Sequence, residues 1–328
     1  MTEQHLYIPP DVSLEDDGRV VQADWNKVYR MDTSPDRILL SFTGMGMPDV
    51  NYITQSGPGQ PGETILDFTL NPRYIQYVHA RTGCSRQDYW DNRLNIGTLL
   101  SPARQLATAQ TYKEGRLRVV LPNGTKRDIN AVIDRGPIFS ARDPKRWSEY
   151  TFVETIRFRC PDPTWFNPDI NEVEWETEIY DGLIFYEPTN YTDRLTFPTN
   201  AIFGADIISA GTSIIYNGTW FGYPIIEIVG PISSPIIQNT TLNQKIALNY
   251  DVANGETVTI ITEYGKKGVT NNFGDNLIGT LTNDSSLKFF LAHDPWATDG
   301  INNLEGSGSG ADENTKIKIL YYTRYIMI

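Results

Sequence analysis

Cysteine and histidine are scarce in this sequence, which limits the chemistry it can perform. The two cysteines, Cys84 and Cys160, lie far apart and outside any metal-ligand spacing. We expect both to be buried, reduced side chains and not a disulfide. The three histidines, His5, His79 and His293, form no H-x-x-x-H pattern, so we interpret them as ordinary core or surface residues.

Long apolar runs and excess positive charge are also missing. No segment reaches the roughly 18 consecutive apolar residues that span a bilayer. The first residues are polar and acidic and lack the basic and apolar regions of a secretory signal, so we expect synthesis and folding in the cytoplasm. The formal net charge is −12. An acidic surface gains nothing from counterion release, which argues against a protein that grips nucleic acid or an anionic membrane.

Helix signals are few, and only one start is convincing. Ser85 followed by Asp88 forms a capping-box pattern, in which side-chain oxygens satisfy free backbone amides. The helix should end before Pro102, because proline disfavours helix in the residue before it.

Strand and turn signals dominate the rest of the chain. Aromatic residues make up 12% of the sequence, which also has 26 Gly and 20 Pro. Apolar residues alternate on both sides of Asn123-Gly124, which predicts a hairpin with a type I′ turn. Asn-Gly pairs recur at 217–218 and 254–255, and residues 172–179 alternate acidic with apolar or Thr side chains, so we expect a strand with a solvated acidic face. Residues 304–312 predict a flexible surface loop.

This pattern predicts a mainly β protein with two domains. Several short strands between turn signals favour a sandwich or a barrel. The proline-rich segment 160–168 sets the expected boundary, giving domains at 1–168 and 169–328.

Several motifs resemble reactive sites but lack the required context. Residues 57–62 match G-x-G-x-x-G, yet prolines interrupt it and a strand-like run follows instead of a helix. Residues 306–310 resemble a nucleophile elbow with Gly308 in place of serine. The many carboxylates identify no acid–base pair, and neither Asp275-Asn276 nor residues 312–314 follow a calcium-binding loop. We predict no enzyme and no catalytic, cofactor-binding or metal-binding residue.

Aromatic residues in expected loops keep one alternative open. Trp220, Tyr223 and Trp296 are suitable for stacking on sugar rings, as in a lectin-like carbohydrate-binding module used for adhesion to a host surface. Tryptophan is equally an ordinary core or interface residue, and we favour that interpretation.

The order and spacing of several segments resemble the distal tail protein (Dit) family of siphophages. The similarity covers nearly the whole chain, most clearly residues 50–165 and 213–328. The segments that carry it are 52–68 with 71–73, 83–93, 115–124, 159–163, 215–220 with 223–231, and 321–326.

The resemblance implies an N-terminal β-barrel-like domain with one short helix and a C-terminal galectin-like β-sandwich. It also implies a structural virion protein, because members of the family form rings, usually hexamers, at the distal end of the tail tube. Such a ring connects the tube protein to the tail-tip hub and receptor-binding proteins and continues the DNA channel. We expect the acidic balance to let DNA pass without specific binding. Exposed strand edges are the expected adhesive between subunits.

Overall fold

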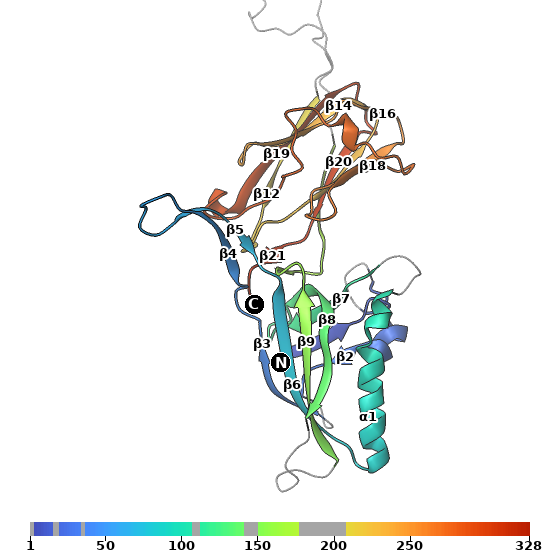
Figure 1. The fold of residues 1–328 in the computed structure, drawn as a ribbon. Helices are drawn as coiled ribbons and strands as arrows, with labels where there is room; N and C mark the ends of the chain where they lie inside the picture. Colours follow the sequence, from blue (N-terminus) through green and yellow to red (C-terminus); the bar gives the residue numbers. More distant parts are fainter. Residues whose placement is uncertain (1–2, 16–19, 34–36, 107–111, 141–149, 177–207) are drawn as a thin grey trace, which may run out of the picture. The chain divides into compact units, whose positions relative to one another are not determined.

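The computed structural model describes residues 3–15, 20–33, 37–106, 112–140, 150–176 and 208–328, which form two compact units. The first unit contains Met1–Asp169 together with Arg324–Ile328, and the second contains Ile170–Thr323. Strands predominate in both (Figure 1), so the expected mainly β fold is confirmed. No helix of the described part is long and apolar enough to cross a membrane.

The first unit is built on one antiparallel sheet with the strand order β2-β1-β7-β8-β9-β6-β3. A further short strand, β10, pairs with β8 and with the C-terminal strand β21. The sheet is curled, since Tyr29 of β2 reaches Glu154 of β9 although three strands separate them in the order. The strands are β1 (Gln4–Ile8), β2 (Tyr29–Arg30), β3 (Arg37–Thr43), β6 (Arg73–Thr82), β7 (Gly115–Val120), β8 (Lys126–Ser140), β9 (Thr151–Cys160), β10 (Trp165–Phe166) and β21 (Arg324–Tyr325).

The single α-helix of the described residues, α1 (Arg86–Leu99), lies beside this sheet (Figure 1). Its start matches the prediction, because the Ser85 hydroxyl accepts a hydrogen bond from the Asp88 amide. Ile96 of α1 and Phe158 of β9 belong to the same buried cluster. The short 3-10 helices η1 (Gln22–Lys27) and η2 (Pro102–Leu106) complete the unit.

The turn between β7 and β8 differs from the predicted type I′ turn. Gly124 has a φ of 85°, but Asn123 does not share the positive φ that a type I′ turn requires. Pro122 fixes its own φ near −65°. The amide of Gly124 therefore donates to the carbonyl of Leu121 (2.8 Å), as in a type I turn followed by a left-handed glycine. Of the other two Asn-Gly pairs, 254–255 has a positive φ at Gly255 alone, and 217–218 has none.

The second unit consists of two five-stranded antiparallel sheets that share one core. The strand orders are β11-β20-β13-β17-β18 and β12-β19-β14-β15, with β16 paired to β14. One buried cluster includes Ile226 and Ile317 of the first sheet and Ile237 and Leu304 of the second, which makes the unit a sandwich. Its elements are β11 (Asn171–Glu176), β12 (Ile208–Ile215), β13 (Ile225–Val229), β14 (Ile232–Asn239), β15 (Gln244–Ala247), β16 (Asp251–Val252), β17 (Thr257–Ile261), β18 (Gly268–Asn271), η3 (Ile278–Thr280), η4 (Thr298–Gly300), β19 (Ile301–Ser309) and β20 (Lys316–Tyr321). The galectin likeness stays a prediction.

The segment expected to be a flexible loop at 304–312 is mostly a strand. β19 continues to Ser309 and pairs with both β12 and β14. Its glycines allow close packing, since a Cβ on Gly306 would lie 2.4 Å from Cδ1 of Ile317 in the opposite sheet. A Cβ on Gly308 would lie 2.5 Å from Ile232. Glycine is therefore needed here for close packing and not for flexibility.

The acidic face expected at residues 172–179 is present where the structure describes it. Glu172 and Glu174 of β11 are exposed, but they are paired with lysines of β20 and not merely solvated. Lys316 and Lys318 donate to Glu174, and these hydrogen bonds hold its pKa below the usual range. Residues 177–179 lie outside the described part of the chain.

Two glycine substitutions test this account of the turn. Gly124→Ala should lower the free energy of unfolding of the first unit by about 1 kcal/mol, because φ of 85° is strained for alanine. Gly97→Ala should raise it by up to about 1 kcal/mol, because Gly97 lies in α1 with open space around its Cβ position. Urea unfolding of both variants measures the difference, and equal effects would contradict the turn assignment.

Candidate assembly surface

Arg73 is a buried hub for backbone carbonyls in the first unit. Its side chain donates to the carbonyls of Pro163 (2.8 Å), Gly44 (3.0 Å) and Gly46, and to Ile326 (2.5 Å). Burial lowers its pKa to about 10, so it remains charged at neutral pH. One cation thus joins the connection after β3, the turn after β9 and the C-terminal segment.

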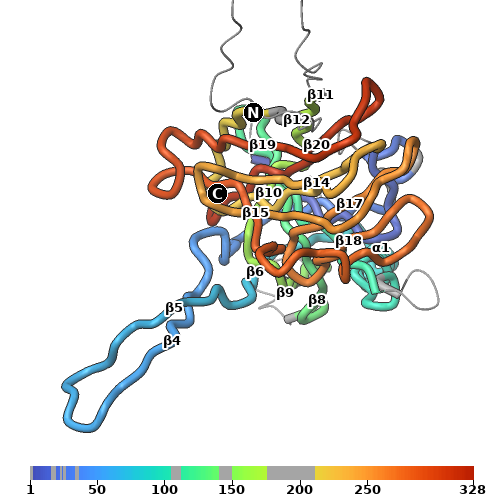
Figure 2. Tube along the Cα trace, turned by 90° about the horizontal axis from the view of Figure 1, so that it is seen from above, coloured from blue at the N-terminus to red at the C-terminus, as the bar shows by residue number. Residues whose placement is uncertain are grey.

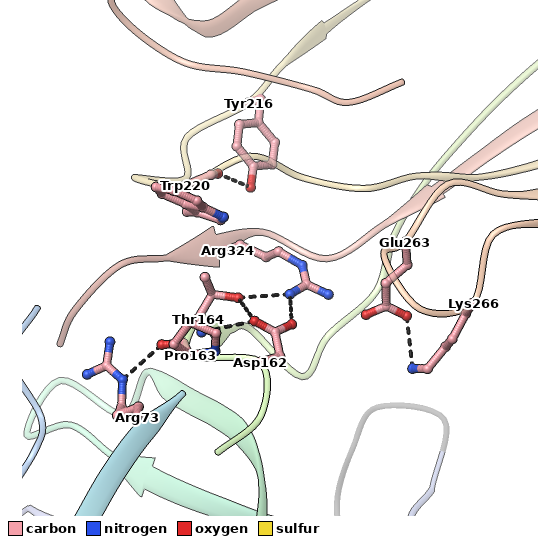
Figure 3. Close-up of polar contacts among 9 residues, drawn as sticks. All are labelled: Arg73, Asp162, Pro163, Thr164, Tyr216, Trp220, Glu263, Lys266 and Arg324. Atoms are coloured by element: carbon pink, nitrogen blue, oxygen red, sulfur yellow. Dashed lines mark hydrogen bonds and ion pairs between the residues drawn. The ribbon is translucent and has the colours of Figure 1, made fainter. Parts of the chain in front are cut away.

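A second set of polar contacts holds the C-terminal strand (Figure 3). Arg324 of β21 donates to the carboxylate of Asp162 and to the hydroxyl of Thr164 (2.8 Å). Asp162 in turn accepts from the Thr164 hydroxyl at 2.7 Å. Since β21 also pairs with β10, residues 324–328 belong to the first unit and not to the second, where the sequence had placed them.

Replacing Arg73 tests the importance of this hub. Arg73→Met should destabilise the first unit by about 3 kcal/mol or more, because it leaves several buried carbonyls without a donor. Hydrogen exchange of residues 324–328 should accelerate at the same time. Arg86→Met is the matched control, since Arg86 is exposed at the start of α1 and should change neither quantity.

The buried histidine His79 belongs to a polar cluster around Glu154. The fully buried Glu154 accepts a hydrogen bond from the Tyr29 hydroxyl (2.6 Å) and lies 3.6 Å from Nδ1 of His79. Nε2 of His79 donates to the carbonyl of Met31 (2.8 Å). The cluster therefore joins β2 and the residue after it to β6 and β9, which is a structural role.

The cluster also makes the stability of the first unit dependent on pH. Burial, together with the charges of Arg37 and Arg81, lowers the pKa of His79 to about 4, although the hydrogen bond to the Met31 carbonyl opposes this shift. Because the unfolded chain takes up a proton near pH 6.5 and the folded one does not, stability should fall as the pH drops from about 6.5 to about 4.

The part of this loss that His79 causes should not exceed about 3.5 kcal/mol and should level off below pH 4. Urea unfolding between pH 7 and pH 4 measures it, and His79→Gln, which keeps a donor for the Met31 carbonyl, should have a shallower slope. Identical slopes in the two proteins would contradict this assignment.

The other residues considered in the sequence do not converge on a reactive centre. His5 contacts the hydroxyl of Tyr77 (2.8 Å), whereas His293 lies in the second unit. Cys160 is buried as expected. Cys84 was also expected to be buried, but it is exposed, because it lies at the surface just before Ser85, the N-cap of α1. The described residues contain no group of three or more His, Cys, Asp or Glu side chains suited to a metal ion.

The residues considered as calcium ligands stabilise turns. The Asp275 carboxylate accepts from the Asn271 side chain (3.0 Å), and Asp312 accepts from the amide of Asn314 (2.8 Å). Asn276 accepts from the amide of Ile278 (3.0 Å). These bonds give each side chain a local structural role.

The three aromatic residues considered for sugar stacking lie in different surroundings. Trp296 is 63% exposed, and its ring lies 6.0 Å from that of Phe221, which also contacts Trp220. Tyr223 instead packs against Tyr264. The structure thus groups Trp220 with Trp296 through Phe221 and leaves Tyr223 apart.

The glycine-rich segment 57–62 forms the tip of an isolated hairpin. It connects β4 (Val50–Gln55) to β5 (Thr64–Leu70), so the strand–turn–helix context of a nucleotide site is absent here. Gly59 and Gly62 both have positive φ, which these turns require.

This hairpin, which we call the arm, extends away from the sheet of the first unit (Figure 2). Among the strands of the described residues, β4 and β5 pair only with each other and form a separate two-stranded sheet. Tyr52 and Phe68 are opposite one another, and both are exposed. Ile53 follows Tyr52 in β4, so it is exposed on the face of the hairpin opposite to that of Tyr52 and Phe68. Ile65 and Leu66 are each 60% exposed. A two-stranded hairpin is marginal alone, and clustered exposed apolar side chains indicate a contact surface.

Helix α1 carries a second apolar patch. Trp90 is 48% exposed and Leu94 is 67% exposed. Residues four apart on a helix lie on the same face, so these two side chains form one surface. Sequence reasoning placed both on the helix but did not predict that they would be exposed.

Charge is divided unevenly between the units. Residues 1–169 and 324–328 contain 21 Lys or Arg and 21 Asp or Glu, whereas residues 170–323 contain 7 and 19, which accounts for the whole net charge of −12. The excess of acidic residues therefore lies in the second unit, and it does not give an acidic channel to the first unit, which we expect to form the ring.

Comparison with known proteins identifies the fold. No family model and no curated protein sequence matches the chain. The crystal structure of the Dit protein of phage SPP1 matches 99% of this chain and 99% of its own, with a TM-score of 0.59 and 12% identity. This chain has the fold of a phage distal tail protein. Two baseplate structures of phage P2, in the activated conformation with calcium or strontium, match at 9% identity with TM-scores of 0.43 and 0.42. The SPP1 protein is described as a paradigm of the hub adsorption apparatus in phages that infect Gram-positive bacteria.

Proposed function

We propose that this distal-tail-like chain is a non-enzymatic structural protein of a phage tail. It forms a ring, six subunits in our proposal, at the distal end of the tail tube. There it joins the tube protein to the tail-tip hub and the receptor-binding proteins, and its ring continues the DNA channel. The observation that carries this proposal is the fold match over both units, since it spans nearly the full length of each chain.

The arm and the helix patch explain how such a ring could hold together. Subunits that meet head to tail need two different surfaces on each copy. The arm supplies one and the Trp90–Leu94 patch of α1 supplies another. Burying an exposed Leu, Ile or Phe side chain contributes about 1.5–3 kcal/mol, so a few such side chains stabilise a contact substantially.

The arm differs from the adhesive predicted from the sequence. Exposed strand edges were expected to join subunits through backbone hydrogen bonds. The arm adds apolar side chains on both of its faces, and within the described part of the chain no further strand pairs with the outer edges of its two strands. Both kinds of contact are available to a neighbouring copy.

A pair of arm substitutions tests the proposal. Ile65→Ser with Phe68→Ser should weaken self-association at least a hundredfold, because both side chains are exposed in the single chain and available to a neighbour. Light scattering and negative-stain imaging of the full chain, alone and with its tube partner, measure the assembly.

The control is Asn51→Ser with Thr69→Ser, which changes two polar residues paired across the same arm. It should assemble like the parent protein, and both double variants should keep the parent unfolding midpoint. A parent protein that stays monomeric at every concentration, even with the tube protein, would refute the ring.

A further inference from the structure

The outer face of β8 and β9 carries a row of arginines. Arg157 and Arg159 of β9 alternate with the fully buried Ile156 and Phe158, so they point away from the core. Arg135 of β8 is exposed and pairs in register with Arg157. Three guanidinium groups therefore share one face of two neighbouring strands.

This arginine face has fewer anions than cations. Arg157 pairs with Asp134 (2.5 Å), but among the described residues Arg135 and Arg159 have no carboxylate within ion-pair distance. Like charges directly opposite on neighbouring strands destabilise a sheet. The register of Arg135 with Arg157 therefore carries a cost that an anionic ligand would relieve.

The surroundings favour a polymer with regularly spaced charges over a single anion. Arg157 and Arg159 are two residues apart on a strand, a separation of roughly 6.5 Å, and Arg135 extends the row to the next strand. Tyr74 is opposite Arg159, and its exposed ring lies 5.2 Å from the Arg157 guanidinium. An aromatic ring beside arginines is suited to a nucleic acid, and guanidinium groups fit phosphate oxygens in pairs.

We propose that the arginine face formed by Arg135, Arg157 and Arg159 binds the phosphodiester backbone of DNA without sequence preference. Backbone contacts carry no sequence information, and they weaken as salt displaces them. The net charge of the chain argued against such contacts, but that charge resides in the second unit, and the first unit is neutral overall. The inference does not require the ring.

The test uses the full chain and a 30-base-pair duplex of random sequence. In fluorescence anisotropy at 50 mM salt, Arg135→Ala with Arg157→Ala and Arg159→Ala should weaken binding at least tenfold. Each lost phosphate contact should also reduce the slope of log affinity against log salt by about 0.9. Self-association measured by light scattering should remain that of the parent protein, which separates this result from failure of the proposed ring.

The control is Arg30→Ala with Arg86→Ala and Lys113→Ala, which removes the same charge from exposed positions of the first unit. It should bind DNA like the parent protein. Equal losses in both triple variants would refute a localised face, as would a parent protein that does not bind DNA. Polyglutamate binding to the face in place of DNA would assign it to an acidic protein and overturn the proposal.

Discussion

The buried guanidinium of Arg73 is the contact on which the organisation of the chain depends. It binds carbonyls of three segments, including that of Ile326 in the C-terminal segment. The chain leaves the first unit after β10 and returns to it at β21. Because β10 and β21 pair with each other, the two connections between the units begin at neighbouring strands of the first unit. Arg324, bonded to Asp162, holds the second of these strands. A cation that is desolvated but makes four hydrogen bonds to carbonyls can join loops that have little apolar surface of their own.

Local patterns predicted the elements well because their causes are local. The Ser85 cap, the alternating residues of β11 and the hairpin around Asn123-Gly124 all depend on residues within a few positions. The predictions that failed depended either on an adjacent proline or on side chains from distant parts of the chain. Pro122 changed the type of turn, and the glycines of β19 were interpreted as flexible because the side chains of Ile317 and Ile232 that require them lie in distant strands.

The candidate surfaces were beyond sequence reasoning for the same physical reason. The strand-like run 64–70 predicts a strand whether its side chains enter a core or face solvent, and only the fold shows that β5 pairs with β4 and with no other strand of the described residues. The register that sets Arg135 against Arg157 follows from bulges in β8, which no pattern indicated. Glu154 likewise looked like any other carboxylate, although it lies in the core.

The arm and the arginine face of the first unit are suited to contacts of different lifetime. Apolar side chains such as Leu66 and Phe68 gain from burial at any ionic strength, so a contact through the arm persists once it forms. Exposed arginines bind through charge that salt screens within about 10 Å, and without a pocket they hold no single ligand atom in place. Persistent contacts hold an assembly together, whereas screened contacts let a charged polymer move past. The role that we propose for this chain needs both kinds of contact, and neither requires a reactive group.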